Sequence, residues 1–219
     1  MKTGENGSES LRAKVYAKLR SGLRHGVIGQ QSLTTERDLA AELGVSRTPI
    51  REALALLVHD GLIVPTTKGF TLPGVTDEDI SEIYELRRLL EPYALRTLVE
   101  HLSLADLKAM RRALEQQIEA HSAGDAAGFA TANQAFRAAW TSRIANSRVQ
   151  ELILHYDDHI VALRELTLAN AHTQQIVIQG LGQILGHLEK GDGKLAAKAM
   201  ERHLVVAEEV LKDTLQHLP

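Results

Sequence analysis

The feature that most constrains this chain is a helix-turn-helix pattern between residues 36 and 60. Leu39 and Ala40 precede Gly44, and Ile50 follows six residues after that glycine. The spacing puts a small residue where two helices cross, a glycine at the turn, and an apolar anchor in the second helix. We therefore predict a helix-turn-helix in this stretch.

Capping residues indicate where these two helices begin and end. Thr35 lies three residues before Asp38, as at a helix start with an acidic partner, and Gly44 is expected to end the first helix. Ser46 is expected to cap the second helix, with Pro49 in its first turn, where a missing N–H costs little. The second helix is expected to stop near Gly61 and to bury its apolar face: Ile50, Ala53, Leu54 and Leu57.

A further helix and a hairpin flank this pattern. Apolar residues recur at every fourth position from Leu11 to Leu23, which is typical of an amphipathic helix. The runs 62–65 and 69–72 are separated by a short polar turn and predict a small β-hairpin. Together these elements make a winged helix-turn-helix.

From residue 76 onward the sequence shows helical periodicity and no strand pattern. We expect helices at about 76–101, 104–121, 125–143, 147–168, 172–190 and 192–217. Starts are expected at Ser103, Thr173 and Asp192, and stops at Gly124 and Gly191. The fold class is therefore mainly α, with an N-terminal winged helix-turn-helix followed by an antiparallel all-helical bundle. The expected boundaries are a disordered tail at 1–8, a winged domain at 9–74 and a bundle at 75–219.

Composition limits the classes of function. The chain has no cysteine, which excludes disulfides and thiolate metal sites, and no apolar run approaches the ~20 residues that cross a bilayer. With no signal-peptide pattern either, we expect a cytoplasmic protein with no membrane partner. The net charge of −3 hides an asymmetry. Residues 1–74 hold ten Lys and Arg against seven Asp and Glu, whereas residues 75–219 hold fifteen against twenty-one, so one end suits phosphate binding.

The second helix of the pattern carries groups that are typical of a helix that reads DNA. Arg47, Thr48 and Arg51 lie at its N-terminal end, opposite its apolar face, and this end of such a helix enters the major groove. Arginine can grip guanine O6 and N7 with two hydrogen bonds, and threonine can reach a phosphate or a thymine methyl. Arg37 could hold backbone phosphate, and Lys68 at the hairpin tip could lie against the adjacent groove or backbone. The alternative is that these charges form a merely solvated helix face.

These residues also carry a resemblance. The runs Leu33–Ala40, Leu43–Leu54 and Gly61-Leu62 closely resemble the DNA-binding domain of GntR-family regulators, and the match covers residues 10–72. The positions that match the DNA contacts of that family are Arg37, Ser46, Arg47, Thr48, Arg51 and the wing glycine, Gly69. The resemblance implies a sequence-specific transcriptional regulator.

The second half resembles the FCD ligand-binding domain of the FadR subfamily, through residues 85–91, 132–152, 191–192 and 199–204. Many members of that subfamily bind a divalent metal through one Asp and three His. The corresponding positions here are Asn133, Arg137, Leu181 and His203, so only the last is retained. Because arginine stays protonated and cannot ligate a metal, we expect no metal cofactor.

Arg137 suggests a replacement for the metal. A guanidinium at that position can grip a carboxylate bidentately. We expect Arg137, helped by Arg87, Asn133, Arg164 and His203, to bind an anionic effector inside the bundle. The alternative is that Arg137 pairs with an internal acid and that the cavity is vestigial or apolar.

A relocated metal site is a rival to this hypothesis. His155 and His159 are four residues apart and share a helix face, and His203 or His187 could complete such a site. Solvated or hydrogen-bonded histidines are the favoured interpretation.

The resemblance implies a homodimer that places two recognition helices in successive major grooves of an operator. Repression, relieved or changed by a small carboxylate metabolite in the bundle, is the favoured mode, and activation stays open. Two other classes of function are considered. No motif in the sequence supports a metal-dependent enzyme. A constitutive architectural DNA binder would have a second domain that no longer senses an effector.

Overall fold

A computed structural model describes residues 10–24, 35–67 and 69–216. The chain divides into two compact units between Gly74 and Val75, at the Pro-Gly break. The expected tail at 1–8 and the predicted contact Lys68 lie outside the described residues.

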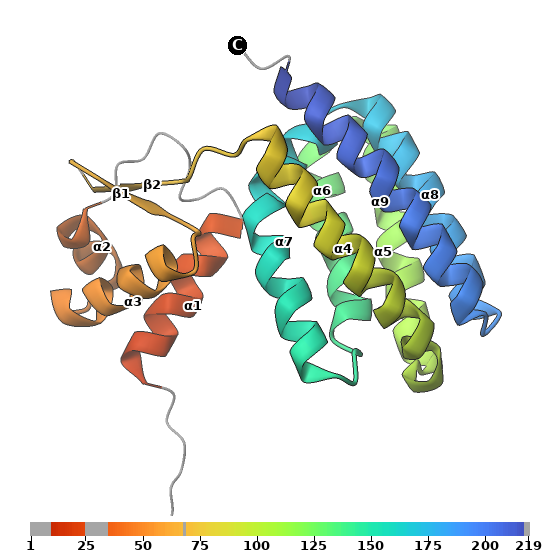
Figure 1. Cartoon of the computed structure of the whole chain (residues 1–219), viewed down its shortest axis with the longest axis horizontal. Helices are drawn as coiled ribbons and strands as arrows, with labels where there is room; N and C mark the ends of the chain where they lie inside the picture. Colours follow the sequence, from red (N-terminus) through yellow and green to blue (C-terminus); the bar gives the residue numbers. More distant parts are fainter. Residues whose placement is uncertain (1–9, 25–34, 68, 217–219) are drawn as a thin grey trace, which may run out of the picture. The chain divides into compact units, whose positions relative to one another are not determined.

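The first unit is a three-helix winged helix-turn-helix (Figure 1). Its elements are α1 (Leu11–Arg24), α2 (Glu36–Leu43), α3 (Arg47–His59), β1 (Val64–Thr66) and β2 (Gly69–Thr71). The strands pair antiparallel, with Pro65 opposite Phe70, and are shorter than the two runs predicted. The described residues therefore bear out the predicted fold class for this part of the chain.

The helix ends follow the predicted caps with one difference. The Thr35 hydroxyl accepts a hydrogen bond from the Asp38 amide at 3.2 Å, and Gly44 adopts φ 65°, a left-handed conformation that glycine takes without a Cβ penalty. Ser46 stands at the N-cap of α3, but its side chain makes no capping hydrogen bond. That hydroxyl is exposed at the start of the recognition helix instead.

Buried aliphatic side chains hold the first unit together. The predicted inward face of α3 is buried: Ile50, Ala53, Leu54 and Leu57. It packs against α1, where Val15, Leu19 and Leu23 are buried, whereas Leu11 is 52% exposed because it opens the helix. The prediction of a buried stripe in α1 is therefore correct for three of its four positions.

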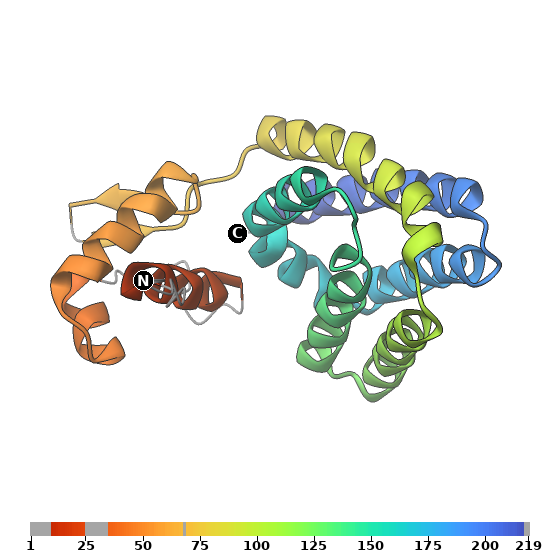
Figure 2. The ribbon, with the colours of Figure 1, turned by 90° about the horizontal axis from the view of Figure 1, so that it is seen from below.

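The second unit consists of helices throughout its described residues. They are α4 (Asp77–Leu98), the 3-10 turn η1 (Val99–His101), α5 (Leu104–Ala123), α6 (Ala126–Thr141), α7 (Ser147–Leu168), α8 (Ala171–Glu189) and α9 (Gly193–Gln216). Seen from below in Figure 2, these helices surround a common interior. α4 packs mainly on α9, α5 on α6, and α8 on both α9 and α5.

Most predicted helix ends lie within about two residues of those observed. Ser103 starts α5 with a reciprocal capping box to Asp106, and Gly124 ends it with φ 68°. The predicted start of α8 at Thr173 is wrong. Asn170 caps that helix, since its side-chain oxygen accepts from two backbone amides, and Thr173 is buried inside the first turn. Among the described helices none is both long and apolar enough to cross a bilayer.

Candidate functional site

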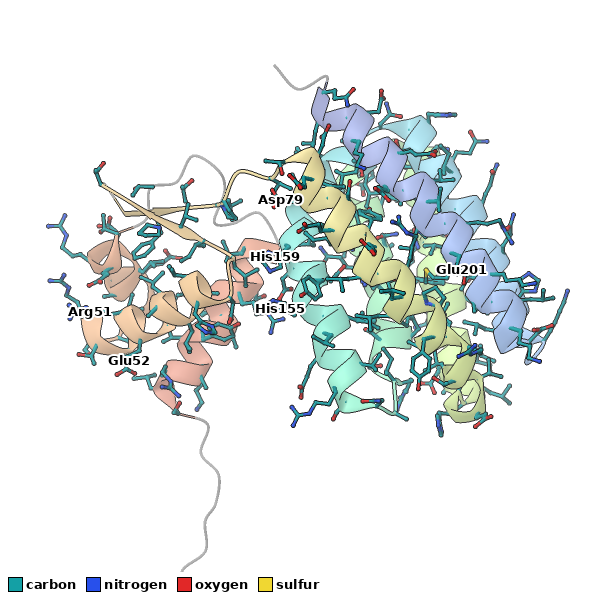
Figure 3. All side chains as sticks on the ribbon, in the orientation of Figure 1. Arg51, Glu52, Asp79, His155, His159 and Glu201 are labelled. Carbon is teal, nitrogen blue, oxygen red and sulfur yellow. The ribbon has the colours of Figure 1, made fainter. Side chains whose placement is uncertain are left out.

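The surface predicted to read DNA lies at the N-terminus of α3. Ser46, Arg47, Thr48 and Arg51 are all exposed there, and Arg51 extends away from the helix in Figure 3. Arg37, at the start of α2, has a side chain that is 85% exposed. The structure therefore leaves the predicted contacts of both helices accessible to a duplex.

The wing contributes Gly69 at the start of β2. Its φ of 141° is a backbone conformation that side-chain-bearing residues rarely adopt. A glycine also lets a phosphate or groove wall approach the backbone closely. The role of Gly69 in DNA binding stays a prediction, as does that of Lys68, which lies outside the described residues.

One carboxylate that was not predicted to belong to this site lies among these arginines. Glu36, the first residue of α2, accepts hydrogen bonds from Arg51 Nε at 3.3 Å and from Arg47 Nη2 at 3.4 Å. Hydrogen bonding by Arg51, reinforced by Arg47, lowers the pKa of Glu36 below its ordinary value. Sequence reasoning missed this contact because Glu36 is eleven and fifteen residues from its partners.

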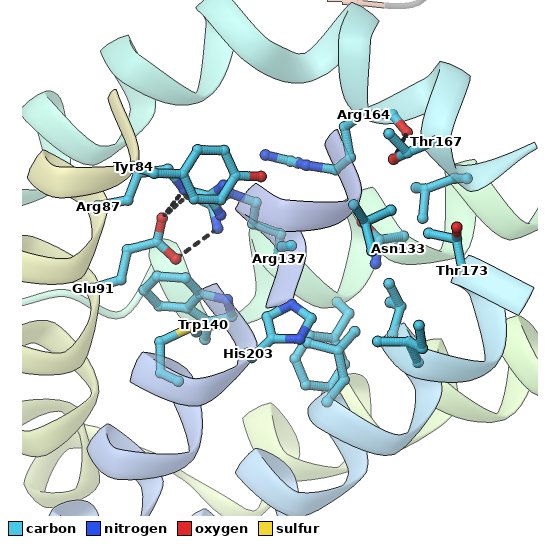
Figure 4. Close-up of a pocket in the computed structure, with 18 residues that line it drawn as sticks. Tyr84, Arg87, Glu91, Asn133, Arg137, Trp140, Arg164, Thr167, Thr173 and His203 are labelled. Carbon is cyan, nitrogen blue, oxygen red and sulfur yellow. Dashed lines mark hydrogen bonds and ion pairs between the residues drawn. The ribbon is translucent and has the colours of Figure 1, made fainter. Parts of the chain in front are cut away.

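The second candidate site is a cavity of about 60 Å³ inside the helical bundle (Figure 4). Helices α4, α6, α7, α8 and α9 all contribute to its lining. All five residues predicted to bind an effector line it: Arg87, Asn133, Arg137, Arg164 and His203. The sequence therefore selected side chains that the fold brings together from four helices.

Glu91 is the centre of the polar network in this cavity. Its carboxylate is wholly buried. It accepts two hydrogen bonds from the guanidinium of Arg137, at 2.9 and 3.0 Å, and one from Arg87 Nε at 2.7 Å. Burial by itself would raise the pKa of Glu91, but the guanidiniums of Arg137 and Arg87 outweigh that effect and lower it to about 2. Arg137 therefore has an internal acidic partner in this structure, as the alternative interpretation of that residue expected.

Asp157 of α7 extends the network. It lies against the guanidinium of Arg164 and has Oδ1 2.8 Å from Arg137 Nε. Burial would raise the pKa of Asp157, but Arg137 and Arg164 hold it well below its ordinary value. The contact to Arg137 Nε is an ion pair whose geometry makes no hydrogen bond, so that N–H remains unsatisfied.

The network retains unused donors and an excess of positive charge. In the described part of the chain, two buried guanidinium nitrogens have no hydrogen-bond partner, Arg87 Nη1 and Arg137 Nε. Three guanidiniums face two carboxylates, which leaves one net positive charge. Buried donors without partners are rare because desolvating them is costly, so they indicate a place for an acceptor.

Two aromatic rings and His203 complete the polar end of the cavity. The guanidinium of Arg87 lies 4.6 Å from the Tyr84 ring centroid, and that of Arg137 lies 5.3 Å from the Trp140 centroid. Burial, with Arg87 next in importance, lowers the pKa of His203 to about 4, so the imidazole is neutral near pH 7. Gly180 of α8 makes room for this ring, since a Cβ there would lie 2.5 Å from His203 Nδ1.

The four positions that match the subfamily's metal ligands do not fit a divalent metal. The guanidinium of Arg137 is engaged by Glu91, and its pKa is raised by Asp157 and Glu91 despite burial. Asn133 donates its amide N–H to Gln117 at 3.2 Å, and Leu181 offers no ligand atom. A protonated guanidinium repels a cation, so these four residues do not suit a divalent metal.

The two histidines of α7, His155 and His159, are half-buried neighbours on one helix face. The rings of His155 and His159 lie 5.0 Å apart in an edge-to-face arrangement, one turn apart in Figure 3. Among the side chains that the structure describes, no group of three or more His, Cys, Asp or Glu could hold a metal ion. The expectation that the chain uses no metal cofactor stays a prediction.

Both units match known protein families. The pattern of the bacterial regulatory proteins of the gntR family matches residues 11–69, and the FCD domain matches residues 82–205. The chain belongs to the GntR family and carries an FCD domain. It is a DNA-binding transcriptional regulator and not an enzyme, because the matched families and named relatives are regulators of this kind. Its placement in the FadR subfamily stays a prediction.

Relatives and solved structures agree with this assignment. The HTH-type transcriptional regulator YdhC of Bacillus subtilis (strain 168) is 27% identical over 203 residues, covering 92% of this chain and 91% of YdhC. The gluconate operon transcriptional repressor of the same organism is 36% identical over 91 residues, covering 42% of this chain and 37% of the repressor. The structure of Escherichia coli McbR/YncC superimposes with a TM-score of 0.82 at 25% identity, covering 94% of this chain and 99% of McbR.

A sequence signal for the missed residues of this GntR-family bundle did exist. Buried positions of α4 recur at helical spacing, and Arg87 and Glu91 stand at two of them between Tyr84 and Leu95. Asp157 likewise lies between buried apolar residues of α7. A charge in a predicted buried stripe indicates an internal partner, although the partner's identity comes only from the fold.

Proposed function

We propose that this GntR-family regulator is a repressor whose operator affinity is controlled by a small carboxylate metabolite, bound in the helical bundle without a metal. The observation that carries the proposal is the pair of buried guanidinium nitrogens that make no hydrogen bond, Arg87 Nη1 and Arg137 Nε. A carboxylate offers acceptor oxygens for both and neutralises the excess charge of the network. A cation would have the opposite effect.

The lining fits a short organic acid. About 60 Å³ corresponds to roughly five water molecules, which limits the occupant to a few non-hydrogen atoms unless side chains move. Tyr84, Arg164 and His203 point toward the polar interior in Figure 4, and Leu168, Val177 and Leu181 line the cavity with apolar surface. A carboxylate head with a short chain matches both kinds of lining.

Repression and dimerisation are the finer parts of the proposal. A relative that is 36% identical over 91 residues is named as a gluconate operon transcriptional repressor, which supports the repressor mode. A helix-turn-helix protein that binds as a homodimer reads two half-sites about one helical turn apart, so we expect a pseudo-palindromic operator. The bound acid would change operator affinity through a coupling free energy between the two sites.

The test is a thermal-shift screen of short carboxylic acids and sugar acids on chelator-treated, full-length protein. A ligand that binds only the native state raises the melting temperature by mass action. Hits are then measured by calorimetry and by their effect on binding to a duplex that the wild-type protein selects from a random library. We expect at least one acid to bind without metal and to change that DNA affinity by about 5- to 150-fold.

Two variants locate the site. Arg164→Gln removes a lining guanidinium and is expected to weaken binding of the acid by at least about tenfold. Arg111→Gln removes an arginine that pairs with Glu189 on the surface and should leave binding unchanged. Stabilisation that appears only with added zinc or nickel would overturn the metal-free site. An absence of response to every acid, with DNA binding intact, would favour a constitutive architectural binder.

A further inference from the structure

Glu36 occupies a position from which it can act on DNA recognition. It opens α2, and its side chain is 23% exposed between the guanidiniums of Arg47 and Arg51, which are 62% and 66% exposed. Arg51 meets it through two nitrogens, with Nε 3.3 Å from Oε1 and Nη2 3.4 Å from Oε2. One carboxylate therefore touches both arginines of the recognition helix.

Glu36 forms ion pairs with both arginines at the surface, and these pairs contribute little to the stability of the fold. Exposed arginine–carboxylate pairs of this length contribute about 0–1 kcal/mol. The lowered pKa of Glu36 keeps the carboxylate ionised throughout the neutral range. Its effect is therefore on where the guanidiniums point and on the charge that a DNA duplex meets.

We propose that Glu36 is a positioning residue that sets the specificity of DNA reading, by holding Arg47 and Arg51 together and by penalising their transfer to backbone phosphates. A guanidinium has five N–H donors, so a pair with Glu36 through one edge leaves the other edge free for a guanine. A phosphate that takes the same arginine must approach the Glu36 carboxylate, which repels it. The penalty falls mainly on sequence-independent contacts.

Discrimination between a recognised sequence and random DNA is a difference between two affinities. Non-specific binding depends almost wholly on phosphate neutralisation and therefore on the net charge of the DNA-facing surface. Base reading depends on the orientation of the two guanidiniums. Removing the Glu36 charge should therefore strengthen binding to random DNA while it weakens the preference for the recognised sequence.

The experiment compares wild type and Glu36→Gln, as full-length proteins, on two duplexes of equal length. One is the sequence that wild type enriches from a random library, and the other is its shuffled version. Affinities are measured over a series of salt concentrations. We expect Glu36→Gln to bind the shuffled duplex about 3- to 10-fold more tightly at low salt, with a steeper salt slope, and to lose about tenfold in the ratio of the two affinities.

Two controls separate positioning from bulk charge. Glu42→Gln removes the same charge from an exposed position on the same helix and should leave the affinity ratio within about twofold. In an Arg51→Ala background, Glu36→Gln should have much less effect on the ratio, as expected of coupled residues. An unchanged ratio in Glu36→Gln, or an equal loss in Glu42→Gln, would overturn the proposal. Circular dichroism checks that each variant is folded.

Discussion

Arginine–carboxylate pairs occupy both units, in opposite solvent environments. On the recognition helix, Arg51 and Glu36 meet at 3.3 Å with the arginine side chain 66% exposed. In the bundle, Arg137 and Glu91 meet at 2.9 Å with the side chains 12% and 1% exposed. The same two functional groups therefore form a solvent-accessible pair on the recognition helix and a buried pair in the bundle.

Solvent explains the difference. An exposed pair is screened by water and salt, so Arg51 and Glu36 can adjust to an approaching duplex at little cost. A buried pair has already lost its hydration, and removing one partner leaves an uncompensated charge in a medium of low dielectric constant. Only an anionic ligand, which balances the excess positive charge, can enter the bundle network at low cost.

The largest expected effect comes from breaking the buried pair. Glu91→Gln leaves Arg137 and Arg87 without their shared charge and should destabilise the second unit by about 3–5 kcal/mol. Urea denaturation followed by circular dichroism measures the change. The matched surface variant Glu36→Gln should cost less than about 1 kcal/mol. Similar losses in the two variants would contradict the contrast between interior and surface.

Acid should weaken the bundle through His203. The folded pKa of about 4 lies below the ordinary value of about 6.5, so the unfolded chain takes up the proton first as the pH falls. The stability contributed by the neutral His203 ring is therefore fully present above about pH 6.5 and is lost as the pH falls toward 4. The expected loss is about 2–3 kcal/mol, because partial exposure of the ring reduces the cost of charging it. Denaturation curves between pH 8 and pH 4 test this, and His203→Gln should show a flatter profile. The same slope in both proteins would assign the acid sensitivity elsewhere.

On the DNA-reading surface, Arg51→Ala should cost about 1–3 kcal/mol at the cognate base, through loss of its hydrogen bonds to the base edge. Binding to the wild-type-selected duplex and to single-base variants measures this loss. The preference at one base pair should relax, whereas binding to random DNA should fall less. Equal losses on selected and random DNA would show that Arg51 contacts phosphate only.

The smallest expected effect belongs to the wing. Lys68→Ala should weaken binding to all duplexes alike and flatten the salt dependence by about 0.9 in logarithmic slope, which corresponds to one phosphate contact. Titrations at several salt concentrations measure the slope. A change in base preference without a change in slope would mean that Lys68 reads sequence in the groove.

Local patterns in the sequence predicted most of the architecture. Apolar periodicity predicted α1 and the bundle helices, because burial of one helix face is a local requirement. The turn at Gly44 follows from a left-handed backbone conformation that few residues other than glycine adopt, and the cap at Thr35 follows from a side-chain oxygen that can accept a backbone N–H. The start of α8 was misplaced because Asn170 and Thr173 can both cap a helix, and the choice depends on burial of Thr173.

The sequence by itself predicted the helix-turn-helix, the helical second half and five of the polar side chains that line the bundle cavity. Only the tertiary structure decided their partners. Glu91 meets Arg137 across 46 residues of chain, and Glu36 meets Arg51 across 15. Helical periodicity tells which side of a helix a residue occupies, whereas pairing of charges depends on how separate helices pack. That packing is fixed by the whole apolar core, and no single stretch of sequence records it.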